Sequence, residues 1–339
     1  MQQFIIEANQ SGQRLDKFLH KYLPNATTSF LYKMLRKKNI TLNGKKAEGK
    51  ELLAIGDEIC FFFSDETFEK FSGISPVSQS SYENKAYDTS FTEEYKRAYL
   101  QLSKEIIAVL YEDDDVLILN KPAGILTQKA EAGDISLNEW MIGYLLHTDK
   151  IKPEELKLFK PSVCNRLDRN TSGIVLCGIS LKGSQVLSEL IRTRELRKFY
   201  RTICRGALTE KVTLTGTLIK DSKTNKVSIQ NYGSDIQTAY EPIANLKHNT
   251  SYIEVELITG KTHQIRAHLA SIGHPLMGDG KYGIEAFNKQ AQKNYGLKHQ
   301  LLHAYRVEFP QSTSLTNLSQ KVFIAPLPEQ FTRILEDLS

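Results

Sequence analysis

The segment that most constrains the fold is residues 162–178, where a polar loop runs directly into a short apolar strand. Arg166 and Asp168 stand on either side of one leucine in that loop. A Thr-Ser-Gly turn at 171–173 follows, and the apolar run after it is short enough for a buried strand. The sequence therefore predicts a carboxylate held at the end of a buried strand, which is a common position for a catalytic acid.

The tripeptide Arg-Leu-Asp also occurs at Arg14-Leu15-Asp16, so it identifies no site by itself. In that copy the leucine belongs to a set of apolar residues that recur at helical spacing. Asp16 then lies on an amphipathic helix, one residue beyond an inward-facing leucine, and we expect it to be a structural or surface carboxylate. The candidate catalytic carboxylate is Asp168.

Residues 1–64 have the pattern of a small α/β module. Two short segments carry apolar residues at helical spacing, with Ser29 as the expected cap of the second helix and Asn39 as its end. Asn43-Gly44 predicts a tight turn, and residues 56–63 predict a closing strand.

Basic side chains gather on the second helix and on the turn after it. They are Lys33, Arg36, Lys37, Lys38, Lys45, Lys46 and Lys50. A solvated helix face is one explanation. We favour the other, a surface that binds RNA phosphates, because clustered cations release counterions from a nucleic acid. The net charge of +5 favours an anionic partner only weakly, so the clustering carries this prediction.

The remaining chain divides into a linker and a larger domain. Residues 65–105 are polar, in part of low complexity and net acidic, and they predict a linker with a helix near 93–102. From 106 to 330 strand-like segments dominate, with a hairpin around an acidic turn at 113–115 and helices over 137–146 and 181–192. This order predicts an α+β fold with a large mixed, mainly antiparallel sheet.

What the sequence lacks excludes several classes of protein. No apolar run approaches the roughly 18 residues of a membrane span, and the N-terminus has no signal-peptide pattern, so we expect a cytoplasmic protein that does not bind membranes. The cysteines form no C-x-x-C pair, which argues for reduced thiols and against a zinc or redox motif. No glycine-rich nucleotide motif occurs, so no nucleotide cofactor is indicated.

A second informative segment is residues 260–279. Thr262 is the expected cap of a helix that Gly273 and Pro275 end. The core-facing positions of this helix are Ile265, Leu269 and Ile272. Arg266 lies near the edge of that face, so its guanidinium must either reach solvent or meet a buried carboxylate.

The three histidines of this segment, His263, His268 and His274, raise the question of a metal. The first two are not at the i, i+4 spacing that places both on one helix face, and no carboxylate follows at the spacing of a zinc protease. A Ser-His-Asp hydrolase is also disfavoured, because no serine lies in a G-x-S-x-G turn. We expect these histidines to hydrogen-bond to loops, and we expect no metal.

Several motifs, in order along the chain, together resemble the RluA-type RNA pseudouridine synthases. They are Asn120-Lys121-Pro122-Ala123-Gly124, Asn165-Arg166-Leu167-Asp168 with Thr171-Ser172-Gly173, Lys198-Phe199-Tyr200, Gly260-Lys261-Thr262-His263-Gln264-Ile265-Arg266, Gly273-His274-Pro275-Leu276, Gly278-Asp279 and Leu302-His303-Ala304. The resemblance covers most of residues 106–330. Residues 1–64 resemble the S-four (α-L) RNA-binding domain, a frequent companion of that family.

The resemblance implies the pseudouridine synthase fold and a reaction that needs no cofactor. The glycosidic bond of a uridine breaks, the uracil rotates, and carbon 5 is joined to the ribose. It assigns catalysis to Asp168, Tyr200 and Arg266. Asp168 is the catalytic carboxylate, Arg266 its ion-pair partner and Tyr200 a ring that stacks on the uracil. Arg166 resembles the arginine that fills the space of the flipped-out base.

The implied partner is RNA, with ribosomal RNA the first candidate and transfer RNA the second, and we expect a monomer. The family usually has histidine where this chain has Asn165, which leaves the anchoring of the loop open. Two alternatives are a catalytically silent RNA-binding or ribosome-assembly factor and a histidine-dependent hydrolase. The presence of Asp168, Tyr200 and Arg266 together disfavours the first, and the missing nucleophile and metal spacing disfavour the second.

Overall fold

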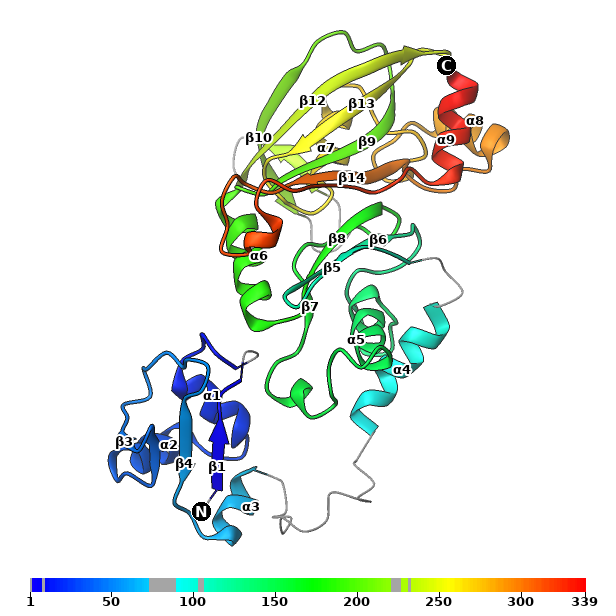
Figure 1. Cartoon of the computed structure of the whole chain (residues 1–339). Helices are drawn as coiled ribbons and strands as arrows, with labels where there is room; N and C mark the ends of the chain where they lie inside the picture. The colour runs from blue at the N-terminus through cyan, green and yellow to red at the C-terminus, as the bar shows by residue number, and fades with distance from the viewer. Residues whose placement is uncertain (1, 8–9, 73–89, 103–106, 221–226, 231–232) are drawn as a thin grey trace.

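The computed structural model describes residues 2–7, 10–72, 90–102, 107–220, 227–230 and 233–339 (Figure 1). The N-terminal part forms a four-stranded antiparallel sheet of order β1-β4-β2-β3. Its elements are β1 (Gln2–Ile5), α1 (Leu15–Tyr22), α2 (Thr28–Arg36), β2 (Ile40–Leu42), β3 (Lys45–Lys46) and β4 (Glu58–Phe61). Buried side chains of both helices and of the sheet share one apolar core, as the predicted α/β module requires.

The turn of this module is confirmed, but the ends of α2 differ from the prediction. Asn43 and Gly44 have φ values of 51° and 71°, the left-handed pair that a two-residue hairpin needs. The helix cap is Thr27, whose hydroxyl accepts from the Phe30 amide, so Ser29 lies inside the helix. The helix ends at Arg36, before Asn39, because Lys38 adopts a left-handed conformation that stops it.

The predicted linker is too long. Its first part is helix α3 (Asp65–Ser72), whose Phe68 is buried in the core of the N-terminal module. Its last part is helix α4 (Ser90–Leu102), which lies beside α5 (Leu137–His147) in Figure 1. The two helices touch so closely that a β-carbon on Gly143 would lie 2.3 Å from the Tyr95 carbonyl oxygen. Tyr95 is buried in the core of the larger part, and residues 73–89 lie outside the described residues.

The larger part is built on a sheet of 11 strands among the described residues, and its mixed, mainly antiparallel character confirms the predicted α+β class. Its main path runs β11-β10-β12-β13-β9-β14-β8-β6-β5, with β15 beside β14 and β7 beside β8. The strands are β5 (Ala108–Glu112), β6 (Val116–Lys121), β7 (Ser162–Val163), β8 (Ser172–Gly178), β9 (Arg197–Arg205), β10 (Val212–Lys220), β11 (Val227–Gln230), β12 (Ser234–Leu246), β13 (Thr250–Leu257), β14 (Leu302–Glu308) and β15 (Val322–Ile324). Among the strands of this sheet in the described residues, only β14 and β8 pair in parallel, and this pair joins the two antiparallel halves.

Helices cover this sheet and complete its cores. They include α6 (Leu181–Thr193), capped by Ser180 as its sequence position suggests, α7 (Gln264–Ser271), α8 (Glu285–Tyr295) and α9 (Glu329–Leu338). Phe331 and Ile334 of α9 are buried against Ile203 of β9, so the fold continues past the predicted boundary at 330.

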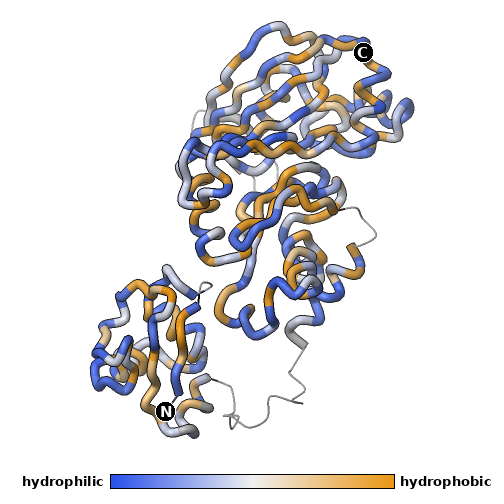
Figure 2. The backbone as a smooth tube through the Cα atoms, viewed as in Figure 1, coloured by the Kyte–Doolittle hydropathy of each residue, from blue (hydrophilic) through white to orange (hydrophobic). Residues whose placement is uncertain are grey.

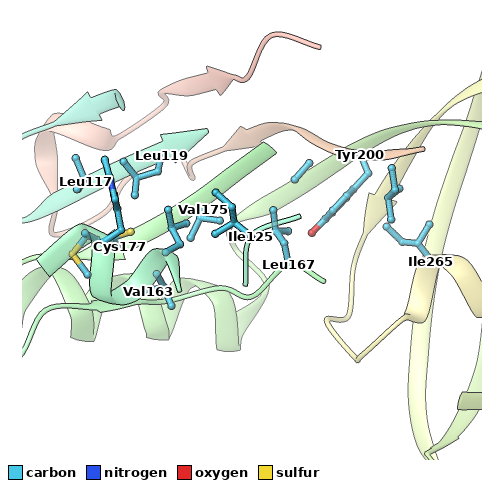
Figure 3. Close-up of a cluster of buried hydrophobic side chains, with 14 of the residues drawn as sticks. Leu117, Leu119, Ile125, Val163, Leu167, Val175, Cys177, Tyr200 and Ile265 are labelled. Carbon is cyan, nitrogen blue, oxygen red and sulfur yellow. The ribbon is translucent and has the colours of Figure 1, made fainter. Parts of the chain in front are cut away.

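The main core lies where the two halves of the large sheet meet. Hydrophobic residues run along β6 and β8 in Figure 2, and every residue of β8 is buried, as a strand covered on both faces requires. Figure 3 shows Val175 of β8 in one cluster with Leu167, Tyr200 and Ile265. The core therefore brings three distant segments together. None of the helices in the described residues is long and apolar enough to cross a membrane.

Candidate active site

The loop before β8 presents Asp168 and is anchored to its surroundings at several points. Asn165 joins it to β8, because its amide nitrogen donates to the Ile174 carbonyl (3.2 Å) and its amide oxygen accepts from the Leu176 amide (2.7 Å). Thr127 Oγ1 donates to the Leu167 carbonyl oxygen (2.8 Å). An amide side chain thus anchors the loop at the position where the family usually has histidine.

A fully buried lysine hydrogen-bonds to the same loop from the end of β6. Lys121, at the end of β6, donates from Nζ to the carbonyl oxygens of Pro122 (2.9 Å), Ile125 (2.9 Å) and Arg169 (3.1 Å). Burial lowers the pKa of the Lys121 ammonium to about 7, although the charge of Asp168 acts in the opposite direction. This side chain ties the turn after β6 to the residue that follows Asp168.

Arg266 of α7 pairs with Asp168, the partner that the family resemblance implied. Its Nη1 lies 2.8 Å from Asp168 Oδ2. Its other two nitrogens, Nε and Nη2, bind both oxygens of Asp279, each at 2.8 Å. Burial lowers the pKa of Arg266, but the hydrogen bonds and charges of Asp279 and Asp168 outweigh it and raise the pKa overall. One guanidinium therefore serves two carboxylates.

Asp279 is the second carboxylate that Arg266 binds, and the sequence did not single it out, although Gly278-Asp279 is among the family-like motifs. Its side chain is fully buried, and Oδ1 also accepts from the amides of Lys281 (2.9 Å) and Tyr282 (3.1 Å). Burial raises the pKa of Asp279, but its bonds to Arg266 outweigh this and lower it. It could have been found from Arg266, because an arginine at the edge of the core-facing side of a helix needs a buried carboxylate as its partner.

Tyr200 lies in the pocket that Asp168 enters. Only 5% of the residue is exposed, and Figure 3 shows its ring between Leu167 and Ile265. Burial, followed by the nearby charge of Asp168, raises the pKa of its hydroxyl, which therefore keeps its proton at neutral pH. The pocket is lined by Arg166, Leu167, Asp168, Thr171, Tyr200, Leu257, Lys261, His263, Gln264, Ile265, Arg266 and Leu302.

Comparison with known proteins places the chain in a family. Residues 115–271 match the family model described as RNA pseudouridylate synthase. A protein of Salmonella typhimurium, named ribosomal large subunit pseudouridine synthase C, is 30% identical over 310 residues, 90% of this chain and 87% of its own length. The chain belongs to the RNA pseudouridine synthase family. An RNA pseudouridine synthase of Mycoplasma genitalium, described as uncharacterised, is 29% identical over 98% of both chains.

The fold and the N-terminal part of this pseudouridine synthase have relatives as well. A solved structure of human RNA pseudouridylate synthase domain containing 4 superposes with a TM-score of 0.53 at 19% identity, covering 73% of this chain and 97% of that one. Residues 13–59 match the S-four domain model. The expected assignment of both parts is thereby confirmed.

The other Arg-Leu-Asp tripeptide of this synthase, Arg14-Leu15-Asp16, has a structural role. Asp16 accepts hydrogen bonds from the Arg14 guanidinium and, at 2.9 Å, from the Tyr32 hydroxyl. It is far from Asp168 in sequence and lines no part of the pocket.

The cations of the synthase that were predicted to contact RNA are exposed to solvent. Arg166 is exposed at the pocket, and no hydrogen bond or ion pair holds its guanidinium in the described part of the chain. Six of the seven clustered cations of the N-terminal module were predicted to contact RNA; all six are exposed, and none of them joins an ion pair among the described residues. They are Lys33, Arg36, Lys37, Lys38, Lys45 and Lys46.

The histidines of the synthase make hydrogen bonds. His268 Nδ1 lies 3.0 Å from Thr238 Oγ1 and His274 Nδ1 lies 2.8 Å from the Arg205 carbonyl oxygen. Within the described residues no group of histidine, cysteine and carboxylate side chains has the arrangement of a metal site. Thr262 does not cap α7, because His263, in a left-handed conformation, is the residue that precedes it.

Proposed function

We propose that this pseudouridine synthase acts on uridines of large-subunit ribosomal RNA, with Asp168 as the catalytic carboxylate. The family membership supports the reaction, and the name of the Salmonella relative supports the RNA. The observation that carries the assignment of Asp168 is its ion pair with the buried Arg266, in a pocket that it shares with Tyr200.

The proposed roles follow from the geometry of the pocket. A uridine inside folded RNA must leave its stack, at a cost of a few kcal/mol, before its base can reach Asp168. The buried Tyr200 ring then offers a flat surface against which the uracil can stack. The Arg166 guanidinium at the pocket edge has no hydrogen-bond or ion-pair partner among the described residues, so it is suited to occupy the vacated space in the RNA or to bind a neighbouring phosphate.

We also propose a division of labour along the chain. Residues 1–72 bind the RNA, and the part from residue 90 to 338 carries out the reaction. This division follows the two separate apolar cores, each of which takes in one of the helices α3 and α4. We place the monomeric protein in the cytoplasm, where ribosomal RNA is its substrate, with no membrane partner and no cofactor.

Mapping pseudouridines tests the function directly. Carbodiimide-dependent primer stops are compared in ribosomal and transfer RNA from cells with and without the gene. We expect stops at specific large-subunit positions to disappear with the gene and to return when the wild-type chain is supplied. An unchanged map in both RNAs would refute the enzyme assignment, and losses confined to transfer RNA would refute the proposed substrate.

Removing the charge of Arg36, Lys37 and Lys38 by triple substitution with glutamine is expected to weaken RNA binding. Each lost phosphate contact reduces the slope of log K against log salt by about 1. Binding is measured as a function of salt concentration. The matched control is a triple glutamine variant of Lys289, Lys293 and Lys298, which are exposed on and beyond α8. Equal slopes in both variants would contradict RNA binding by the N-terminal cluster.

A further inference from the structure

His263 faces Asp168 from the residue that precedes α7. Its Nε2 lies 3.8 Å from Asp168 Oδ2, and only 12% of its side chain is exposed. Its φ of 54° is in the left-handed region, where a residue with a β-carbon is strained by about 1 kcal/mol or more. The surrounding contacts must therefore hold this residue in place.

Tyr282 contacts the ring nitrogen of His263 that points away from Asp168. The tyrosine oxygen accepts from the Val227 amide of β11 (2.9 Å) and lies 3.0 Å from His263 Nδ1. In the bond from Val227 the amide supplies the hydrogen, so the one proton of the phenol remains available for donation to His263 Nδ1. Nδ1 is then an acceptor, and the neutral ring carries its hydrogen on Nε2, the nitrogen that faces Asp168.

The contacts of Asp168 are also one-sided. The Arg266 hydrogen bond and the approach of His263 both involve Oδ2. In the described part of the chain no hydrogen bond is made to Oδ1. The oxygen on one side of the carboxylate is thus held by the protein, and the other is open to the pocket.

We propose that His263 is a positioning residue of this synthase, a neutral Nε2–H donor that closes on Oδ2 of Asp168 and leaves Oδ1 to react. This inference rests on the proposed function of Asp168. The present separation of 3.8 Å shortens to about 2.9 Å when a base fills the pocket, since catalytic hydrogen bonds commonly tighten in the substrate complex.

The charges around His263 favour the neutral ring. The groups that face it are Asp168, Arg266, Lys281, Asp279 and the phenol of Tyr282. Burial lowers the pKa of His263; the two carboxylates raise it and the two cations lower it further, with a net lowering. A neutral donor orients Asp168 without adding a second cationic contact, beside Arg266, to a carboxylate that must remain reactive.

The tautomer can be measured without any activity. Long-range proton–nitrogen NMR spectra distinguish the two neutral tautomers, and the His263 signals are those missing in His263→Gln. We expect hydrogen on Nε2 in the wild type and a mixture in Tyr282→Phe, which removes the donor to Nδ1. A wild-type ring that carries its hydrogen on Nδ1 would overturn the proposal.

Kinetics test the positioning role. At saturating RNA we expect His263→Leu to lower kcat about tenfold with KM unchanged, as for one lost hydrogen bond. His263→Gln, whose amide N–H can replace Nε2–H, should recover most of that loss. Leucine and glutamine are equally unsuited to a φ of 54°, so strain alone would impair both variants alike, and that result would refute the role.

The control variant is His274→Gln, because that ring binds the Arg205 carbonyl oxygen outside the pocket; its kcat should equal that of the wild type. A wild type that forms no pseudouridine would refute the proposed function instead, and the NMR result would be unaffected. A His263→Leu variant with full kcat, beside an active wild type, would refute only the role of His263.

Discussion

Asp168→Asn is expected to abolish pseudouridine formation, by about a thousandfold or more, while the fold and the RNA affinity stay nearly unchanged. Asparagine has the size of aspartate but neither its charge nor its reactive oxygen. The stability should survive because Arg266 keeps both of its hydrogen bonds to Asp279, so no buried cation is left alone. Single-turnover pseudouridine formation, RNA binding and urea unfolding are measured on the same preparation.

The matched control for this prediction is Asp16→Asn, the same substitution in the other Arg-Leu-Asp tripeptide. Asp16 is held by Arg14 and Tyr32, so this variant should lose some stability and keep its turnover at saturating RNA. If Asp168→Asn retained turnover, or if Asp16→Asn lost it, the assignment of the two tripeptides would be wrong.

Arg266→Met is expected to lose both activity and about 3–5 kcal/mol of stability at pH 7, because it leaves the fully buried Asp279 without a cation. In the wild type the lowered pKa of Asp279 means that its contribution is present above its unfolded pKa of 3.8 and is lost as the pH falls further. In the variant, burial raises the pKa of Asp279, and only the weaker hydrogen bonds from the Lys281 and Tyr282 amides oppose it. The variant should therefore lose stability as the pH rises above about 4, opposite to the wild type.

A double-mutant cycle separates the buried charge from the lost packing. Arg266→Met combined with Asp279→Asn removes both charges, and we expect it to be more stable at pH 7 than Arg266→Met alone, though equally inactive. Urea unfolding at pH 4 and pH 7 provides the measurement. A double variant no more stable than the single one at pH 7 would show that Asp279 is not a buried charge that depends on Arg266.

The sequence predicted a contact of the site where a charged side chain at the edge of the core needed a partner of opposite charge. Arg266, at the edge of an apolar helix face, had to reach solvent or meet a buried carboxylate, and the family resemblance indicated the loop carboxylate Asp168 as its partner. The same reasoning stopped too early, because a guanidinium has donors for two carboxylates, and Asp279 takes two of the three hydrogen bonds. Local patterns contained no information on that sharing, which depends on how the segment after α7 turns back.

Boundaries of helices and strands were predicted well only where the local sequence pattern agreed with the packing of the folded chain. Ser180 caps α6 and the acidic turn joins β5 to β6, since both depend on neighbouring residues alone. The helix predicted near 93–102 is confirmed as α4, but it was assigned to a linker, whereas its Tyr95 and Ala98 form an apolar stripe that is buried against α5. That burial depends on Gly143, some fifty residues away, and no local pattern could reveal it.

The parallel pairing of β14 with β8 has a consequence for the synthesis of the protein on the ribosome. Asp168 precedes β8, whereas Tyr200 and Arg266 belong to the half of the sheet that begins at β9. β14 is the strand between these halves, and it fits against β8 so tightly that a β-carbon on Gly173 would lie 2.2 Å from the Ala304 carbonyl oxygen. A growing chain therefore contains Asp168, Tyr200 and Arg266 before residues 302–308 emerge to align them. We therefore expect the enzyme to be inactive until β14 has formed between β8 and β9.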